Sequence, residues 1–334
     1  GEWIMAYTTI DNPGEYFNTK LYTGNGSNRD ITGVGFQPNF TWIKQRNGTF
    51  SHVLGNSVSG DNKFLVSSAT QAESTDSDKF RTFVSDGFQV GTHNGVNGSS
   101  KTYVGWSWKA GTSFSNDASS TSVGSIDSVG SVSTTAGFSI ISYTGNNTGG
   151  ATIAHGLGVT PNVLIIKNRD DSNQAHWAVY HDKAFVSAAD PNIVYLQDDA
   201  AQADDTNIRH STATTNSTVF SIGDYNGVNG SGDAIIAFCF AEKQGYSKFG
   251  SYIGNGNADG PFIYTGFKPA WVMVKPTSRT GRWRIKDNKR DINNVMDKRL
   301  SAESSDAEGT GSTEYIDFLS NGFKARASEG QWNG

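Results

Sequence analysis

The stretch that decides the fold is Pro161-Asn162-Val163-Leu164-Ile165-Ile166-Lys167, a proline followed by an apolar run that ends in lysine. The same pattern occurs as Pro38-Asn39-Phe40-Thr41-Trp42-Ile43-Lys44 and as Pro269-Ala270-Trp271-Val272-Met273-Val274-Lys275. Proline suits the first residue of a strand because it has no N–H, and consecutive apolar positions indicate a strand buried on both faces. We expect the terminal lysine to extend its ammonium group into water where the strand leaves the core.

Two further sequence anchors surround each proline run in a constant order. The first is an aromatic strand that ends in Gly-Asn, at residues 21–25, 142–146 and 251–255. The second is a Gly/Asn turn, at residues 95–98, 227–230 and, in a degenerate form, 332–334. Three anchors in the same order predict three tandem repeats of roughly 110 residues each.

The predicted fold class is all-β, because short apolar runs alternate with turns rich in Gly, Asn and Ser. We expect three tandem repeats of antiparallel strands that form sandwich-like or jelly-roll-like units. A propeller-like arrangement of the repeats is the alternative. The predicted divisions are an N-terminal arm at 1–15, repeat 1 at 16–111, a Ser/Thr-rich linker at 112–135, repeat 2 at 136–244 and repeat 3 at 245–334.

The third repeat lacks the closing strand that follows the Gly/Asn turn in the other two. This strand is Thr102–Trp108 in repeat 1 and Ala234–Phe240 in repeat 2, whereas the sequence of repeat 3 stops at Gly334. The N-terminal residues Glu2-Trp3-Ile4-Met5-Ala6-Tyr7 resemble such a strand. One hypothesis is that they pair into repeat 3 of the same chain or of a neighbouring chain, which would cover an exposed sheet edge. The alternative is a chain that is truncated before its own closing strand.

Charge and cysteine content exclude several classes of protein. The formal net charge of the 334-residue chain is −5, so it has no general attraction to nucleic acid or to an anionic membrane. The single cysteine, Cys239, excludes an intrachain disulfide framework and a cysteine-based metal site. No apolar stretch approaches the length of a membrane span. The sequence therefore predicts neither nucleic acid as a partner nor insertion into a membrane.

Sequence motifs for catalysis are absent. There is no G-x-S-x-G elbow, H-E-x-x-H motif, P-loop or EF-hand loop. The spacing of His176 and His181 would place them on opposite faces of a strand, so they cannot share a metal there. Pairs of adjacent aspartates in repeat 2 have no recognisable ligand spacing for Ca²⁺ and are better explained as solvated loops. We therefore expect no enzyme activity, no cofactor and no bound metal.

The most distinctive local feature is a basic segment around Trp283 in repeat 3. Arg282 and Arg284 flank this tryptophan at strand spacing, so one face would be basic and could bind anionic groups. Trp332, in the degenerate Gly/Asn turn, is the tryptophan expected to be an exposed binding aromatic. The alternative is a solvated face whose charges are balanced by nearby aspartates. The candidate binding residues are Arg282, Trp283, Arg284, Lys286, Lys289, Arg290 and Trp332.

Several phrases of the chain resemble virion proteins of marine tailed bacteriophages, which are repeat-containing structural or tail-fibre-like proteins. These phrases are Ala6-Tyr7-Thr8-Thr9-Ile10-Asp11-Asn12-Pro13 with Leu21-Tyr22-Thr23-Gly24-Asn25, and Phe240-Ala241-Glu242 followed by Gly245-Tyr246-Ser247-Lys248-Phe249-Gly250-Ser251-Tyr252. The resemblance implies a location in the virion, on the tail or the particle surface. It also implies a tail-fibre-like, rigid β scaffold for binding other virion subunits or a host-surface glycan.

The resemblance implies a homo-oligomer as well, with a trimer as the common form among tail fibres. Two other functions stay open from the sequence. One is a capsid decoration protein, for which we expect a large apolar patch that makes a lattice contact. The other is a polysaccharide-degrading tail enzyme, for which we expect a cleft with two close carboxylates.

Overall fold

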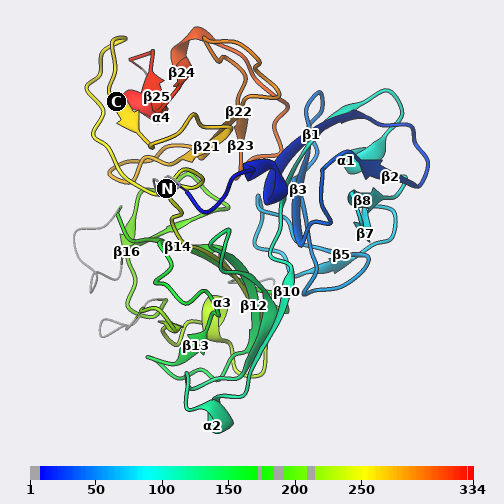
Figure 1. Cartoon of the computed structure of the whole chain (residues 1–334), viewed down its shortest axis with the longest axis vertical. Helices are drawn as coiled ribbons and strands as arrows, with labels where there is room; N and C mark the ends of the chain where they lie inside the picture. Colours follow the sequence, from blue (N-terminus) through cyan, green and yellow to red (C-terminus); the bar gives the residue numbers. More distant parts are fainter. Residues whose placement is uncertain (1–7, 172–174, 184–191, 209–214, 329) are drawn as a thin grey trace, which may run out of the picture.

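A computed structural model describes residues 8–171, 175–183, 192–208, 215–328 and 330–334. The predicted closing strand at residues 2–7 lies outside the described residues. Strands dominate the regular structure, so the predicted all-β class is confirmed. Figure 1 shows three lobes in chain order, which we call unit 1 (16–111), unit 2 (112–244) and unit 3 (245–334).

Unit 1 is a sandwich of two antiparallel sheets. The inner sheet has the order β1-β9-β3-β4, with β1 (Phe17–Thr23), β9 (Thr102–Trp108), β3 (Phe40–Gln45) and β4 (Val53–Asn56). The outer sheet has the order β2-β8-β7, with β2 (Arg29–Thr32), β8 (Gly87–Val90) and β7 (Phe80–Val84). A short hairpin, β5 (Lys63–Phe64) and β6 (Ser74–Thr75), lies beside them. Tyr22, Tyr103 and Phe88 are buried between the two sheets, as the alternating pattern of these strands requires.

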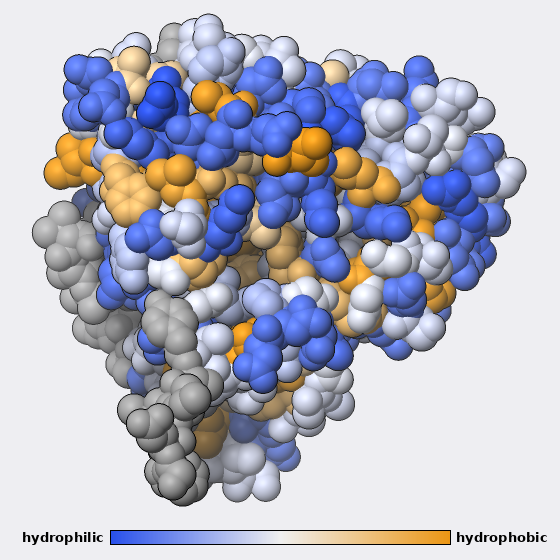
Figure 2. Space-filling model, turned by 45° about the horizontal axis from the view of Figure 1, so that its top comes forward, coloured by the Kyte–Doolittle hydropathy of each residue, from blue (hydrophilic) through white to orange (hydrophobic). Residues whose placement is uncertain are grey.

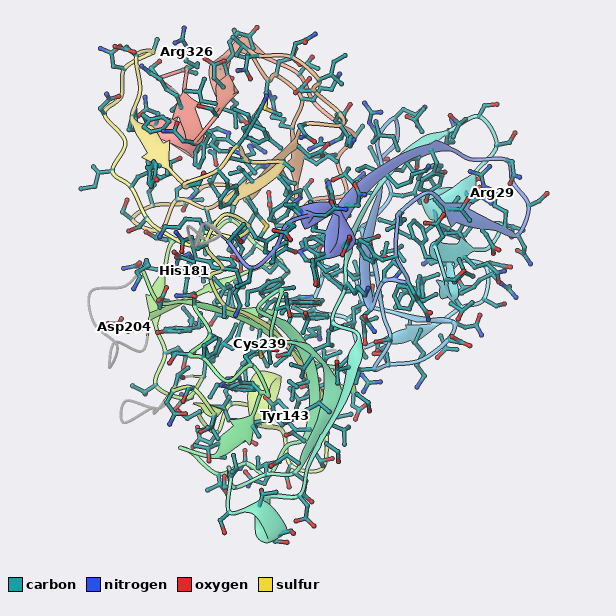
Figure 3. The ribbon with its side chains drawn as sticks, viewed as in Figure 1. Arg29, Tyr143, His181, Asp204, Cys239 and Arg326 are labelled. Atoms are coloured by element: carbon teal, nitrogen blue, oxygen red, sulfur yellow. The ribbon has the colours of Figure 1, made fainter. Side chains whose placement is uncertain are left out.

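Unit 2 repeats this plan around a longer sheet. Its order is β10-β11-β12-β19-β14-β15-β16-β17, in which β12 (Phe138–Thr144), β19 (Ala234–Phe240), β14 (Val163–Asn168) and β15 (Ala178–His181) correspond to the inner sheet of unit 1. The edge strands are β16 (Asn192–Tyr195) and β17 (Ala203–Asp204), and the second sheet is β13 (Thr152–Ala154) with β18 (Val219–Ser221). Figure 3 shows Tyr143 of β12 and Cys239 of β19 inside this unit.

The Ser/Thr-rich stretch between repeats 1 and 2 is largely ordered as part of the unit 2 sheet. It forms β10 (Thr112–Asn116), the helical turn α2 (Ala118–Thr121) and β11 (Ser128–Ser133). Strand β11 pairs with β12 along its whole length. Ser and Thr permit this because their side chains tolerate a half-exposed strand, and Val132 supplies an apolar contact to the core.

Unit 3 has the same order of elements but smaller sheets. One sheet is β20 (Phe262–Tyr264), β25 (Gly322–Ala325) and β24 (Ile316–Leu319), and the other is β21 (Trp271–Val274), β22 (Arg284–Asp287) and β23 (Leu300–Ser301). Strand β21 pairs with β22 on one side. Among the described residues no strand pairs with its other side, which β9 covers in unit 1 and β19 covers in unit 2.

The three units surround one shared apolar core. Each inner sheet turns its second face toward this core, which contains Trp42 and Trp106 from unit 1, Phe238 from unit 2, and Trp283 and Ile285 from unit 3. Strands β3 and β14 are therefore buried on both faces, as the consecutive apolar residues of β14 predict. The units are arranged in a ring, but each is a two-sheet sandwich and not a single-sheet blade.

Equivalent residues form the three joints of this ring. The residue two positions after each repeat lysine accepts a backbone hydrogen bond from a neighbouring unit. Arg46 O accepts from Glu308 N at 2.7 Å, Arg169 O from Glu73 N at 2.8 Å, and Thr277 O from Gln202 N at 2.8 Å. These bonds connect unit 1 to unit 3, unit 2 to unit 1, and unit 3 to unit 2, so the ring closes.

In the buried part of each joint, a nitrogen of a tryptophan or histidine ring also bonds to a backbone carbonyl of the neighbouring unit. Trp177 of unit 2 donates to Val66 O of unit 1 at 2.9 Å, and Trp283 of unit 3 donates to Tyr195 O of unit 2 at 2.8 Å. The equivalent of these tryptophans in unit 1 is His52, whose Nε2 lies 2.9 Å from Ser301 O of unit 3. Polar groups in the buried joints therefore satisfy one another across units.

The prediction that the repeat lysines extend into water is wrong for Lys44 and Lys167, whose side chains are fully buried. Backbone carbonyls replace water as the acceptors: Lys44 Nζ donates to Gln45 O at 2.7 Å, and Lys167 Nζ donates to Asn168 O at 2.6 Å. Lys167 also reaches Thr70 O of unit 1 at 3.1 Å. Burial lowers the pKa of both lysines to about 8.

The predicted Gly/Asn turns are single turns of α-helix: α1 (Asn94–Asn97), α3 (Asn226–Asn229) and α4 (Gly330–Asn333). The last asparagine of each is buried and its Oδ1 accepts the N–H of the asparagine in the Gly-Asn anchor. The donors are Asn25 to Asn97 at 3.1 Å, Asn146 to Asn229 at 2.8 Å and Asn255 to Asn333 at 2.8 Å. We call each of these contacts an asparagine clasp. The glycine before each donor is required by close packing: a Cβ on Gly145 would lie 2.2 Å from Gly230 O.

Candidate functional site: an apolar groove in unit 3

A large cavity lies beside β21, on the side where no described strand pairs with it. It runs between residues 246–254 and β21, has a volume of about 1410 Å³, and is called the open groove below. Residues of the shared core form its floor, among them Phe17 and Trp108 of unit 1 and Phe240 of unit 2. In Figure 2 hydrophobic residues gather in a band across this face of the molecule, with a hollow at its middle.

Comparison with the other units shows how far the apolar surface of unit 3 is exposed. All six residues of β3 and all six of β14 are buried, whereas all four residues of β21 are only partly buried. At the rim Ile253 is 90% exposed and Tyr264 is 60% exposed. Large apolar side chains that gather at one concave site indicate a surface that binds a partner or a ligand.

Trp271 is the central aromatic residue of the open groove. Its ring lies edge-on to Trp108 at 5.7 Å and also packs near Phe17 at 6.3 Å. Its indole N–H is buried and has no hydrogen-bond partner among the described residues. An unpaired buried donor is costly, so an acceptor from a bound segment would stabilise this site.

The charged side chains that line the open groove are all basic in the described part of the chain. They are Lys248, Lys268, Lys275, Arg279 and Lys289. Two of them are already engaged: Lys248 pairs with Glu242 at 2.5 Å, and Lys275 Nζ donates to Ala200 O of unit 2 at 2.6 Å. On the unit 2 side the ring of His181 lies 6.3 Å from that of Phe249, and Figure 3 shows His181 on the side of unit 2 that faces unit 3. A groove with an apolar floor and a basic rim favours an occupant that has apolar side chains and also carries a negative charge.

Most of the predicted basic binding face is buried inside unit 3. Lys286 is fully buried, and Arg284 and Arg290 are 8% and 3% exposed. Arg284 pairs with Glu314 at 2.6 Å, and Arg290 pairs with Asp287 at 2.5 Å and with Glu308 at 3.1 Å. Unit 3 has a small core, and these ion pairs and the backbone acceptors of Lys286 replace apolar packing there. The expected exposed basic face is therefore wrong for these three residues.

The other predicted binding residues have separate environments. Arg282 is half-buried and pairs with Asp306 at 2.7 Å, while Lys289 is exposed beside the open groove. Trp283 is buried in the joint with unit 2. Trp332 is only 1% exposed, so the expectation of an exposed aromatic is wrong. It is buried because α4 is an asparagine clasp, which packs Trp332 against Phe323.

Sequence reasoning missed the aromatic residues of the open groove, Trp271 above all, because their run reads as an ordinary core strand. No local signal marks them, because the groove is lined by residues of all three units that are distant in sequence. Within the described ranges, no three His, Cys, Asp or Glu side chains gather at one place.

Comparison with known families places the chain in one of them. Residues 12–334 match the model of a family described as a domain of unknown function, DUF7483, and because the match spans nearly the whole chain, the protein belongs to this family. Neither curated proteins nor solved structures yielded a match. In the described part of the chain, none of the helices has the length and apolar character that crossing a membrane would require.

Proposed function

We propose that the chain is a tail-fibre-like structural protein of a bacteriophage virion. In this proposal it supplies a rigid β scaffold that binds a host-surface glycan or a neighbouring subunit, and it acts as a homo-oligomer on the tail or particle surface. The resemblance of residues 6–25 and 240–252 to virion proteins of marine tailed phages supports the location.

The observation that carries the proposal is the closed ring of joints. Each unit contacts both others through equivalent backbone hydrogen bonds, and all three share one core. Rotation of one unit would break two joints and expose core residues, so the ring resists bending. A rigid body of this kind leaves its surface loops free to vary and to bind partners.

The virion location is tested by immunogold electron microscopy on particles of the phage that encodes the chain. Antibody raised against the purified chain is expected to label the tail appendages, and antibody pre-absorbed with the same chain serves as the control. Label spread over the capsid would replace the tail-fibre-like function with a decoration function. Purified particles without label, and without the chain by mass spectrometry, would contradict both.

A further inference from the structure

We propose that the open groove binds an extended segment as the missing closing strand of unit 3, and that its occupant is the N-terminal segment of this chain, residues 2–7. The inference concerns how unit 3 is completed and does not depend on a virion location. It rests on the internal repeat, on the register of the closing strands in units 1 and 2, on the path of the chain at Thr8, and on the charges of the groove and the segment.

Units 1 and 2 show what the groove lacks. In unit 1 the closing strand β9 lies between β1 and β3 and pairs antiparallel with both. In unit 2 the closing strand β19 lies between β12 and β14 in the same way. The corresponding walls in unit 3 are residues 247–253 and β21, and the open groove separates them. A strand in this place would pair with the free edge of β21.

The repeat also fixes the register of the occupant. Trp271 corresponds to Phe40 and Val163, which lie opposite the last residues of the closing strands, Trp108 and Phe240. If Tyr7 takes that last position, then Met5 lies opposite Met273. Trp3, Met5 and Tyr7 would then face the shared core.

The residue types agree with this register. The core-facing closing-strand positions hold Val104, Trp106 and Trp108 in unit 1 and Ile236, Phe238 and Phe240 in unit 2. The large side chains of Trp3, Met5 and Tyr7 match them. On the other face Ala6 takes the position of the small residues Ser107 and Cys239. Alternation of this kind is what a strand with two different faces requires.

The chain path brings the segment to the groove without a connecting loop. The first described residue, Thr8, lies against Gly245 at the end of the groove, where a Cβ on Gly245 would be 3.0 Å from that of Thr8. In unit 2 the residue after the closing strand is Ala241, and its N–H donates to Gly137 O at 2.7 Å. Gly137 is the equivalent of Gly245, so Ala241 and Thr8 occupy equivalent positions. Thr8 therefore lies where a closing strand that ends at Tyr7 would leave the groove.

The charges of groove and segment are complementary. The charged lining residues of the groove in the described part of the chain are all basic, and Glu2 is the one charged side chain of the segment. The register places Glu2 opposite Pro276, on the strand face that Tyr103 turns toward α1 in unit 1. The equivalent helical turn in unit 3 is α4, where the guanidinium of Arg279 lies against Gly330, so a carboxylate there would meet this cation.

Disulfide trapping tests the register in the full chain. Met5→Cys combined with Met273→Cys is expected to form a disulfide within the monomer under mild oxidation, because directly opposed residues lie within bonding range. Ala6→Cys with Met273→Cys is the matched control, since its thiol would face away. A disulfide between two chains would overturn the assignment to the same chain and make a second copy the occupant. No disulfide in a folded double variant, or equal yield in the control, would overturn the proposal.

Hydrogen–deuterium exchange supplies a second test that needs no new thiols. A chain that begins at Thr8 is expected to exchange the amides of Trp271–Val274 at least about tenfold faster than the full chain, while β3 and β14 stay protected. A synthetic peptide of residues 1–8 should restore the protection, and the same peptide with Met5→Asp should not. Unchanged exchange at β21 after removal of residues 1–7 would contradict the proposal.

Discussion

The guanidinium of Arg46 forms a two-point ion pair with the carboxylate of Glu308, with Nη2–Oε1 at 2.7 Å and Nε–Oε2 at 3.0 Å, although 262 residues separate them in the chain. Arg169 and Glu73 form the equivalent pair between units 2 and 1 at 2.7 Å. At the third joint Thr277 and Gln202 take these positions and keep only the backbone bond. The first and last units are therefore held together as firmly as consecutive ones.

Glu308→Gln should weaken the joint between units 1 and 3. Glu308 also accepts from Arg290, whose guanidinium is fully buried, so the change leaves a buried cation with fewer charged partners. We expect the free energy of unfolding to fall by about 2–4 kcal/mol, measured by urea denaturation. Glu242→Gln, in the more exposed pair with Lys248, should cost less than about 1 kcal/mol. Equal effects of the two changes would show that the joint contributes no special stability.

Asn229→Ala should destabilise unit 2 by removing an asparagine clasp. The side chain accepts from Asn146 N and donates to Gly223 O at 2.8 Å and Thr148 O at 3.0 Å, so one buried and two partly buried hydrogen bonds are lost. The expected loss is about 2–4 kcal/mol in the free energy of unfolding. Asn226→Ala changes an exposed residue of the same helical turn and should be close to neutral. A neutral Asn229→Ala would mean that water can replace the clasp.

Stability should rise with pH above pH 8 because of the buried lysines. Burial lowers the pKa of Lys167 to about 8, so between pH 8 and the ordinary lysine pKa the folded chain binds fewer protons than the unfolded chain. By linkage, the free energy of unfolding then increases with pH, by at most about 1 kcal/mol per pH unit for each such lysine. Urea denaturation at pH 8.0 and 9.5 should show a smaller increase for Lys167→Met than for the wild type. Lys289→Met, at an exposed position, should keep the full increase.

Trp332→Ala should unfold or strongly destabilise unit 3, since Trp332 is buried against Phe323. Loss of a buried tryptophan leaves a cavity and costs about 3–5 kcal/mol, which thermal denaturation followed by circular dichroism can detect. Tyr264→Ala, at the exposed rim of the open groove, should change stability by less than about 1 kcal/mol. If the Trp332→Ala chain is as stable as the wild type, Trp332 does not contribute to the core of unit 3, and the expectation of a surface residue would stand.

The repeat was predictable from the sequence because its anchors are local. Proline at the start of a strand and a double-sided apolar run depend on neighbouring residues alone, and they correctly indicate the buried strands β3 and β14. The burial of Lys44 was not predictable in this way, because a lysine at the end of a strand ordinarily extends into water. Here the neighbouring unit covers it, and no local pattern encodes which unit lies there.

The candidate site was less predictable for the same reason. Arg282, Arg284 and Lys286 alternate in sequence with apolar residues, which is equally typical of an exposed basic face and of a buried ion-pair network. The acids that decide between these, Glu314 and Glu308, are distant in sequence and meet the arginines only after folding.

The sequence by itself determined the all-β class and the three repeats. Each of these follows from short-range pattern, because strands and tight turns are specified by a few adjacent residues. Only the tertiary structure decided that the units close into a ring, that the repeat lysines and Trp332 are buried, and that Trp271 lies open in a groove. Burial is a property of surfaces brought together from distant parts of the chain, so it appears only once the three units pack on one core.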